Sequence, residues 1–467
     1  MQDRVTRTNT CEFRKKADYV LYWMQVNRRV ESNHALLHAA ELANERKLPL
    51  LVYETLTYEY PLANARLHTF VLEGVPSLSA ALHELGAGYC FDLRRDGRDP
   101  GDGLYQLASR AAAVVTDDYP TYLVREQNKN AAKLMDVPFF QVDSSCVVPM
   151  RQIEKKQYAA YTIRPRIHRQ LPKYLSAAAP AHLAKRFRSS PPEFHTEVSA
   201  ETIPDRVASC RIDHSVKPSI SFRGGREEAQ RRLRRFLEAK LRDYADSRNE
   251  PTRHVTSDLS PYLHWGHISS LEVALAARDY GKAHGIDTDS FIEELIVRRE
   301  LSFNHSLFSA RPDCLRNLPE WALETLRIHA TDLREPCYTK LEFENAATHD
   351  ELWNATQREM RLRGKIHGYY RMYWGKKIIE WSRTCQDALE TMLHIHDRFA
   401  LDGRDPNTYA SILWCFGLHD RPWQERPIFG KVRYMALSGM RRKTDVDSYL
   451  REIELLERTG KDPFHVQ

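Results

Sequence analysis

The first 150 residues alternate short apolar runs with amphipathic stretches, and this alternation constrains the fold more than any other feature of the chain. Apolar runs with the length and composition of strands cover residues 18–24, 48–56, 88–93, 112–119 and 137–143. The first two runs enclose VESNHALLHAAELANERK, whose apolar residues recur at helical spacing. Strands that alternate with helices form a parallel sheet covered on both faces. We therefore predict an α/β domain over residues 17–150.

This predicted sheet lacks the two common nucleotide-binding motifs. The sequence contains neither GxGxxG nor GxxxxGK[ST], so neither of the phosphate loops that those motifs form is expected. A crevice outside the carboxyl ends of parallel strands can still hold a ligand.

The pattern changes twice after residue 150. Residues 151–225 are rich in Pro, Ser and Ala and have little periodicity, which predicts a long linker. From Arg226 onward helical patterns dominate, beginning with REEAQRRLRRFLEAKLRDYADSRNEP. Further helices are predicted near residues 266–282, 288–305, 350–362, 366–382, 384–399 and 406–415. We predict an all-α domain over residues 226–467.

Composition limits the class of protein. The chain has 467 residues, 28% of them charged, and a net charge of +6, so a polyanionic partner is compatible with it. No apolar run approaches the ~18 residues of a membrane span. The eight cysteines include no CxxC pair and the histidines no HExxH motif. We expect a cytoplasmic monomer without a membrane segment, a disulfide framework or a metal site.

The stretch from Trp353 to Trp381 indicates a site. His367, Arg371, Trp374, Ile378 and Trp381 follow one another at spacings of four, three, four and three, so they share one helix face. An arginine on such a face needs a carboxylate nearby, and LDGRDPN offers Asp402 and Asp405. A cation, a carboxylate and a file of indoles suit a redox cofactor, although tryptophans at helical spacing more often belong to a core.

TSDLSPYLHWGHIS, residues 256–269, is a candidate phosphate-binding segment. Ser260 followed by Pro261 predicts a helix start with Ser260 as N-cap. Such a start offers free N–H groups to an anion, and the hydroxyls of Thr256 and Ser257 add donors. The alternative is an ordinary capped helix.

HGYYRMYWGKKIIEW, LDGRDPN and ERPIFGKVRYM together resemble the flavin-binding half of the photolyase/cryptochrome family. The likeness extends from about Ala17 to about Asp447 and is closest to the class II cyclobutane-pyrimidine-dimer photolyases. It implies a Rossmann-like antenna domain, a long linker and a helical FAD-binding domain. It also implies an antenna chromophore of deazaflavin or folate type in the first domain.

The resemblance assigns roles to residues. Arg371 would pair with Asp402, while Asp405 and Asn407 would meet the flavin ring and its ribityl chain, and Tyr244 would pack on the cofactor. Asp258 should turn its carboxylate away from the phosphates. The FAD pyrophosphate would be held by Thr256, Ser257, Asp258, Leu259 and Ser260. Electrons would reach the flavin through Trp374, Trp353 and Trp381.

The lesion side follows from the same resemblance. Glu294, Met372 and Trp414 would contact the pyrimidine dimer. UV-damaged DNA would also be held by Arg248, Arg421, Trp423 and Arg433. Two residues have plainer alternative interpretations: a salt bridge to Arg298 or Arg299 for Glu294, and a solvated surface charge for Arg248.

Four features depart from class II relatives. His396 replaces an Asn that faces the central-ring nitrogen of the flavin, where a histidine could supply a proton. Arg298 replaces a base-stacking Trp, Thr408 replaces a Gly, and the CFGLHD loop is one residue shorter.

The resemblance implies light-driven repair of cyclobutane pyrimidine dimers by reduced FAD. The alternative is a cryptochrome-like photosensor that binds FAD without repairing DNA. A weaker third hypothesis is repair of another photoproduct.

Overall fold

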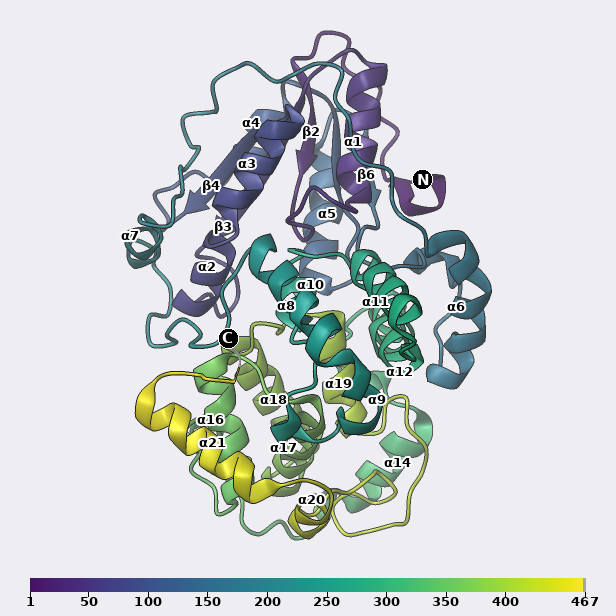
Figure 1. Ribbon diagram of the computed structural model, residues 1–467, viewed down its shortest axis with the longest axis vertical. Helices are drawn as coiled ribbons and strands as arrows, with labels where there is room; N and C mark the ends of the chain where they lie inside the picture. The colour runs from purple at the N-terminus through teal and green to yellow at the C-terminus, as the bar shows by residue number, and fades with distance from the viewer. Residues whose placement is uncertain (465–467) are drawn as a thin grey trace.

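A computed structural model describes residues 1–464, apart from the side chain of Tyr122, and its sheet and helices form two halves (Figure 1). The six-stranded sheet lies at the top of that view, the helices α16 to α21 lie at the bottom, and α8, α10 and α11 lie between them. Within the described part of the chain, no helix is both long and apolar enough to cross a membrane.

All five predicted strands are confirmed, and one strand at the edge was missed. The sheet order is β1-β6-β5-β2-β3-β4. All neighbours are parallel except β1 and β6, where Val5 pairs with Val142 in antiparallel register. The strands are β1 (Val5–Arg7), β2 (Tyr19–Trp23), β3 (Leu50–Thr57), β4 (Gly88–Arg94), β5 (Ala111–Asp117) and β6 (Phe139–Val142).

Helices cover both faces of this sheet, as predicted. Along β2, Val20 and Tyr22 point into a core with α1, while Leu21 and Trp23 point into the opposite core with α4, which is the two-residue period of a strand. The helices of this half are α1 (His34–Glu45), α2 (Ala65–Leu72), α3 (Val75–Leu85), α4 (Gly103–Ala108) and α5 (Tyr122–Leu134). The α/β fold class is therefore confirmed.

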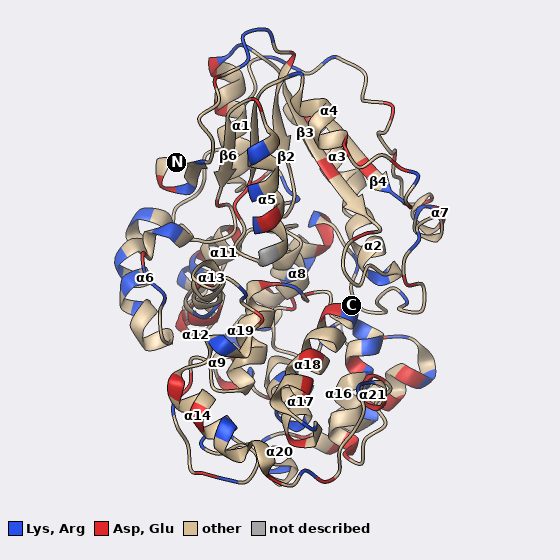
Figure 2. Ribbon diagram, turned by 180° about the vertical axis from the view of Figure 1, so that it is seen from behind, with Lys and Arg blue, Asp and Glu red and all other residues tan. Residues whose placement is uncertain are grey.

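The segment predicted as a linker contains more regular structure than expected. It holds α6 (Ala160–Tyr174) and α7 (Ile203–Ala208). Pro165 and Pro172 lie inside α6 and hid its pattern, while Ile163 and Ile167 bury its inner face in the core. Basic residues recur along α6 (Figure 2). We keep the division at residues 150 and 225 as a proposal for the domain boundaries.

The second half is helical, and the described residues from 226 onward contain no strand beyond a single bridge between Arg426 and Gly430. The predicted long helix at Arg226 breaks at Lys240 into α8 and α9, and the one near 288–305 includes a wide π-helical turn at Glu293–Arg298. The first set is α8 (Arg226–Ala239), α9 (Leu241–Ser247), α10 (Ser260–His264), α11 (Ser270–His284), α12 (Asp289–Ile292), α13 (Arg299–Leu307), α14 (Glu320–Ile328) and α15 (Lys340–Glu344).

The C-terminal helices carry most of the predicted site. They are α16 (Glu351–Arg363), α17 (Gly368–Trp381), α18 (Cys385–Phe399), α19 (Pro406–Cys415), α20 (Leu437–Lys443) and α21 (Val446–Thr459). As predicted, the first helix of the tryptophan stretch ends at Gly364, whose φ of 78° suits glycine. At Gly375 an added Cβ would lie 2.6 Å from Cys415 Sγ, so α17 and α19 pack closely only with glycine there.

Candidate active site

A cavity of about 950 Å³ opens between α9, the π-helical turn, α17, α18 and α19. It is large enough for a cofactor and part of a substrate. The predicted site residues that line it are Tyr244, Arg248, Thr256, Ser260, Glu294, Arg371, Met372, Trp374, His396, Asp402, Asn407, Trp414 and Arg433. The lining residues thus come from distant parts of the sequence: Tyr244 and Arg433, nearly 190 residues apart, line the same cavity.

The predicted ion pair between Arg371 and Asp402 is present on the cavity wall. Arg371 Nη2 lies 3.1 Å from Asp402 Oδ2, and the Ser260 hydroxyl donates to the same oxygen at 2.7 Å. Burial alone would raise the pKa of Asp402, but the nearby Arg371 overcomes it and holds that pKa well below its usual value. Asp402 is therefore ionised, and Arg371 keeps a partner.

Several buried polar atoms on this wall have no partner among the described residues. They are Arg371 Nε, His367 Nε2 and both ring nitrogens of His396. Burial, and after it the charge of Arg371, lowers the pKa of His396 to about 3, so its ring is neutral near pH 7 and has a single N–H to donate. Unpaired buried donors and acceptors are costly, and a flat polar cofactor against this wall would satisfy them.

The three predicted relay tryptophans form a continuous file behind the cavity. The rings of Trp374 and Trp353 are 6.5 Å apart and nearly parallel, and Trp353 and Trp381 are 6.3 Å apart edge to face. Trp374 donates its indole N–H to Gln357 Oε1 at 3.0 Å, and Trp353 donates to the carbonyl of Trp374. Trp374 lines the cavity and Trp381 borders a depression on the surface beside Lys377.

The candidate phosphate segment is positioned differently from the prediction. Leu259, not Ser260, is the N-cap of α10, and Ser260 uses its hydroxyl on Asp402. Thr256 lines the cavity, whereas Ser257 and Leu259 do not. Asp258 has a φ of 57°, and its carboxylate binds Lys365 at 3.0 Å and Lys240 at 3.5 Å.

Asp405, predicted to meet the flavin ring, is not among the residues that line the cavity. Its carboxylate caps α19 by accepting from Asn407 N at 2.8 Å. It also accepts from the Tyr119 hydroxyl at 2.9 Å and lies 3.2 Å from His264 Nδ1. Asp405 therefore joins the two halves of the molecule behind the wall that Asp402 forms.

Glu294 has a different partner from the two considered in the sequence. Its carboxylate binds Arg248 Nη1 at 2.6 Å, while Arg298 binds Glu293. The π-helical turn widens the helix at this point, and such turns are frequent at functional sites. Both Arg248 and Glu294 line the cavity mouth.

The mouth is bounded on the other side by a cluster of aromatic and charged side chains. The guanidinium of Arg433 lies 4.1 Å from the Trp423 ring and 5.4 Å from the Trp414 ring. Arg421 also stacks on Trp423, whose indole N–H donates to Asp420. Trp423 is 37% exposed, and neither it nor Arg421 lines the cavity, so both lie on its rim.

The prediction missed several residues that line or support the cavity, among them four with a polar or charged side chain. Tyr161 and Arg164 come from α6, and Lys365 follows Gly364. Lys376 lies fully buried behind Trp414. The basic pattern of α6 was the one available signal, but its prolines argued for a linker.

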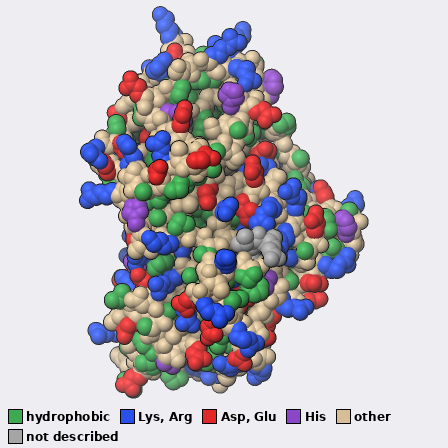
Figure 3. Space-filling view, turned by 60° about the vertical axis from the view of Figure 1, so that its left-hand side comes forward, with side chains coloured by type: hydrophobic (Ala, Val, Ile, Leu, Met, Phe, Trp, Pro, Cys, Tyr) green, Lys and Arg blue, Asp and Glu red, His purple; other side chains and the backbone are tan. Residues whose placement is uncertain are grey.

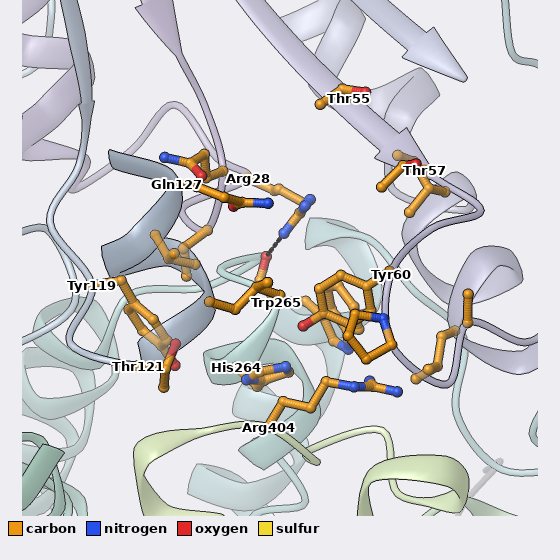
Figure 4. A pocket seen from close by; sticks show the side chains of 18 of the residues that line it. Arg28, Thr55, Thr57, Tyr60, Tyr119, Thr121, Gln127, His264, Trp265 and Arg404 are labelled. Atoms are coloured by element: carbon orange, nitrogen blue, oxygen red, sulfur yellow. Dashed lines mark hydrogen bonds between the residues drawn. The ribbon is translucent and has the colours of Figure 1, made fainter. Parts of the chain in front are cut away.

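A second, smaller cavity of about 150 Å³ lies at the carboxyl ends of β2, β3 and β5 (Figure 4). It occupies the position where β2 pairs with strands on both sides, the crevice considered in the sequence. Tyr60, His264, Trp265 and Arg404 face one another across it in Figure 4. Buried atoms without a partner among the described residues are Trp23 Nε1, Thr55 Oγ1, both His68 nitrogens, and Arg404 Nε and Nη1.

Comparison with known proteins identifies the family. The sequence profile described as DNA photolyase matches residues 20–184. A deoxyribodipyrimidine photo-lyase of Methanothermobacter thermautotrophicus is 40% identical over 97% of this chain and 98% of that protein. The deoxyribodipyrimidine photo-lyase of Arabidopsis thaliana is 35% identical over 95% and 90%.

Two solved structures share the fold. A cryptochrome of Synechocystis sp. PCC6803 superimposes with a TM-score of 0.71 at 15% identity over 96% of this chain and 91% of that one. A class III photolyase of Agrobacterium tumefaciens gives 0.68 at 16% identity over 97% and 94%. At these identities the likeness concerns the fold alone.

With a fold and a site of this type, the chain belongs to the DNA photolyase family, whose members bind a flavin. It is an enzyme, a lyase that acts as a DNA photolyase.

Proposed function

We propose that this enzyme repairs cyclobutane pyrimidine dimers in DNA, in the manner of class II photolyases, by light-driven electron transfer from reduced FAD. The observation that carries the proposal is the single large cavity with the Arg371–Asp402 pair on its inner wall and Glu294, Met372 and Trp414 nearer its mouth. A cofactor and a lesion can occupy such a cavity together.

The residues of the inner wall fit a flavin. Arg371 and Asp402 would meet the polar edge of the ring, His396 would offer its one N–H, and Asn407, Thr256 and Tyr244 would contact the rest of FAD. When bound, reduced FAD supplies an electron on excitation by light. The protein holds and orients the cofactor and excludes water from it. The roles of Ser257, Asp258 and Leu259 at the phosphates remain part of this proposal.

The tryptophan file supports a route for electrons from the surface. Trp374 lies on the cavity wall, and Trp353 and Trp381 continue outward at ring distances under 7 Å. These residues would bring oxidised flavin to its reduced form before repair.

The mouth supports recognition of a lesion that has left the helix. Reactions on a base require the base to leave its stack, and aromatic and cationic side chains hold it outside. Trp414 offers a face for stacking, Met372 an apolar contact, and the Glu294–Arg248 pair a polar one. Arg421 and Trp423 on the rim would enter the duplex, and Arg433 orients Trp423.

The smaller cavity is where we propose an antenna chromophore. Its unpaired donors on Trp23, Thr55 and Arg404 fit carbonyl or phenolate oxygens of such a molecule. Its volume of about 150 Å³ is below that of a typical ligand pocket, so a deazaflavin or a folate would enter it in part. The absorption spectrum of the purified protein tests this, because an antenna adds a band to those of the flavin.

The decisive test of function is illumination of chemically reduced protein with an oligonucleotide containing one thymine dimer. The expected result is recovery of thymine absorbance that requires light and reduced flavin. A sample kept dark and one illuminated with oxidised protein are the controls. Flavin binding without any recovery would favour the photosensor instead.

A further inference from the structure

Two cations lie close to the ring of Trp414. Lys376 Nζ lies 4.9 Å from the centre of its ring, and the Arg433 guanidinium lies 5.4 Å from it. Lys376 comes from α17 and Arg433 from the segment that follows the shortened loop. Cations at such distances from an indole face interact with its electrons.

Lys376 is an unusual residue for this position because it is fully buried. Its ammonium donates to the carbonyl of Cys415 at 2.6 Å. Within residues 1–464 no carboxylate lies at ion-pair distance from it. Asp420, the carboxylate whose charge acts on it, binds Arg433 at 3.4 Å and Trp423. A buried charge without a counter-ion destabilises the folded protein. This cost indicates that the ammonium of Lys376 has a function.

Trp374, the other indole on the cavity wall, has neutral surroundings. Its ring stacks on Trp353, meets the neutral His396 edge to face at 6.4 Å, and donates to the Gln357 amide. Among the described contacts no cation lies over the face of Trp374 or Trp353. Lys377 lies 5.4 Å from the Trp381 ring, but Glu380 at 2.5 Å neutralises it. The two walls of one cavity therefore present the same side chain in opposite electrostatic settings.

We propose that Lys376, assisted by Arg433, keeps Trp414 from giving an electron to the bound flavin, so that electrons enter only through Trp374. Loss of an electron leaves a positive charge on an indole, and a fixed cation about 5 Å away raises the energy of that state. The same positive field favours negative charge on a lesion stacked against Trp414. The inference rests on the proposed function, and Lys376 acts through Trp414 without touching the cofactor.

The electrons balance without Trp414. Full reduction of oxidised flavin takes two electrons and a proton, so the file would carry two electrons in succession. Each would pass from Trp374 to the flavin, with Trp353 refilling Trp374 and Trp381 refilling Trp353. Two thiols in solution, acting as reductant, would refill Trp381 twice and end as a disulfide, and one of the protons that they release would go to the flavin. Among the described ring contacts, Trp414 has no comparable file of indoles from which a lost electron could be replaced.

Fluorescence of oxidised flavin in the purified protein tests the proposal, because electron donation by a neighbouring indole quenches it. Trp374→Phe should raise the fluorescence, since the remaining indole is a poor donor. Adding Lys376→Met should abolish that increase, and adding Trp414→Phe to the double variant should restore it. Lys377→Met is the matched control: it removes the next lysine of α17, which binds Glu380 at 2.5 Å and lies over Trp381. In the Trp374→Phe background it should leave the fluorescence unchanged.

Two results would overturn the inference. One is a Trp374→Phe variant that stays quenched until Trp414 is also replaced, and the other is Lys376→Met without effect in that background. If Lys376→Met does not fold, Arg433→Met, a half-exposed position, carries the same test with a smaller loss of fluorescence. Purified protein without flavin absorbance would instead contradict the proposed function itself.

Discussion

The two aromatic walls of the large cavity differ in charge and in what lies behind them. The inner wall presents Trp374, whose neighbours are neutral and whose file leads through Trp353 to Trp381. The outer wall presents Trp414, whose ring has both Lys376 and Arg433 close to it. Trp374 and Trp414 therefore serve different purposes although they are the same residue type. The charges around each ring determine the purpose that it serves.

The cationic groups of the two walls also differ in whether they have a counter-ion. Asp402 neutralises Arg371 on the inner wall, while the Lys376 ammonium behind the outer wall has no such partner. Basic and acidic side chains are interspersed over the face that Figure 3 shows. The net charge of +6 therefore says less about the cavity than the positions of its individual charged residues do.

Asp402→Asn removes the carboxylate of the inner wall, and its effect, a loss of flavin affinity, should be the largest. It leaves Arg371 without its counter-ion in a buried site, which costs about 3 kcal/mol and corresponds to about a hundredfold loss of flavin affinity. Flavin titration of the apoprotein measures it. Asp397→Asn, a partly buried carboxyl beside the smaller cavity, is the control and should retain flavin. Equal affinities for both variants would remove Asp402 from the site.

Lys376→Met should change how stability depends on pH. Burial lowers the pKa of Lys376 from 10.5 to about 8. Between those values the unfolded chain binds more protons than the folded one, so the stability of the wild type rises with pH. Relative to the variant, the wild type should gain up to about 3 kcal/mol from pH 7.5 to 10.5, since one pKa unit corresponds to about 1.4 kcal/mol. Urea unfolding of the apoproteins measures this, and parallel pH curves would contradict a buried ammonium.

Trp414→Ala should affect only the outer wall, and so only the binding of damaged DNA. Loss of one stacking contact lowers affinity for dimer-containing DNA by about tenfold. Affinity for undamaged DNA and flavin content should stay the same, since neither depends on the stacked lesion. An equal loss for both DNAs in a fluorescence-polarisation titration would mean that Trp414 contacts the backbone and not the dimer.

His396→Asn should have the smallest effect, because a neutral imidazole and an amide both donate one hydrogen bond. The absorption bands and the reduction potential of the bound flavin should shift without loss of flavin. His267→Asn is the control, since His267 is equally buried and has a similarly lowered pKa but lies outside the cavity. Identical spectra for wild type and His396→Asn would show that the ring does not face the cofactor.

The parts of the molecule that follow from local patterning were predictable from the sequence. The five parallel strands, the helix break at Gly364 and the helical second half depend on apolar period and on Gly and Pro. That Arg371 needs a carboxylate was also predictable, and LDGRDPN offered Asp402 and Asp405; the family resemblance selected Asp402.

Other features depend on contacts that spacing does not encode. The role of Asp405 is set by Tyr119, nearly 290 residues away in the α/β half. Glu294 pairs with Arg248 across helices instead of with its own neighbours. The helix α6 was hidden because its two prolines suggest a linker, and the short β1 has only three residues. Lys376 gave no signal, since a lysine in GKK is normally a surface charge.

The most direct test of the account is to measure flavin photoreduction and dimer repair side by side in Trp374→Phe and Trp414→Ala. We expect Trp374→Phe to lose photoreduction yet repair DNA once it is reduced chemically. Trp414→Ala should be photoreduced normally and repair poorly at limiting DNA. Loss of both activities in both variants, or normal photoreduction in Trp374→Phe, would contradict a cavity with two separate walls.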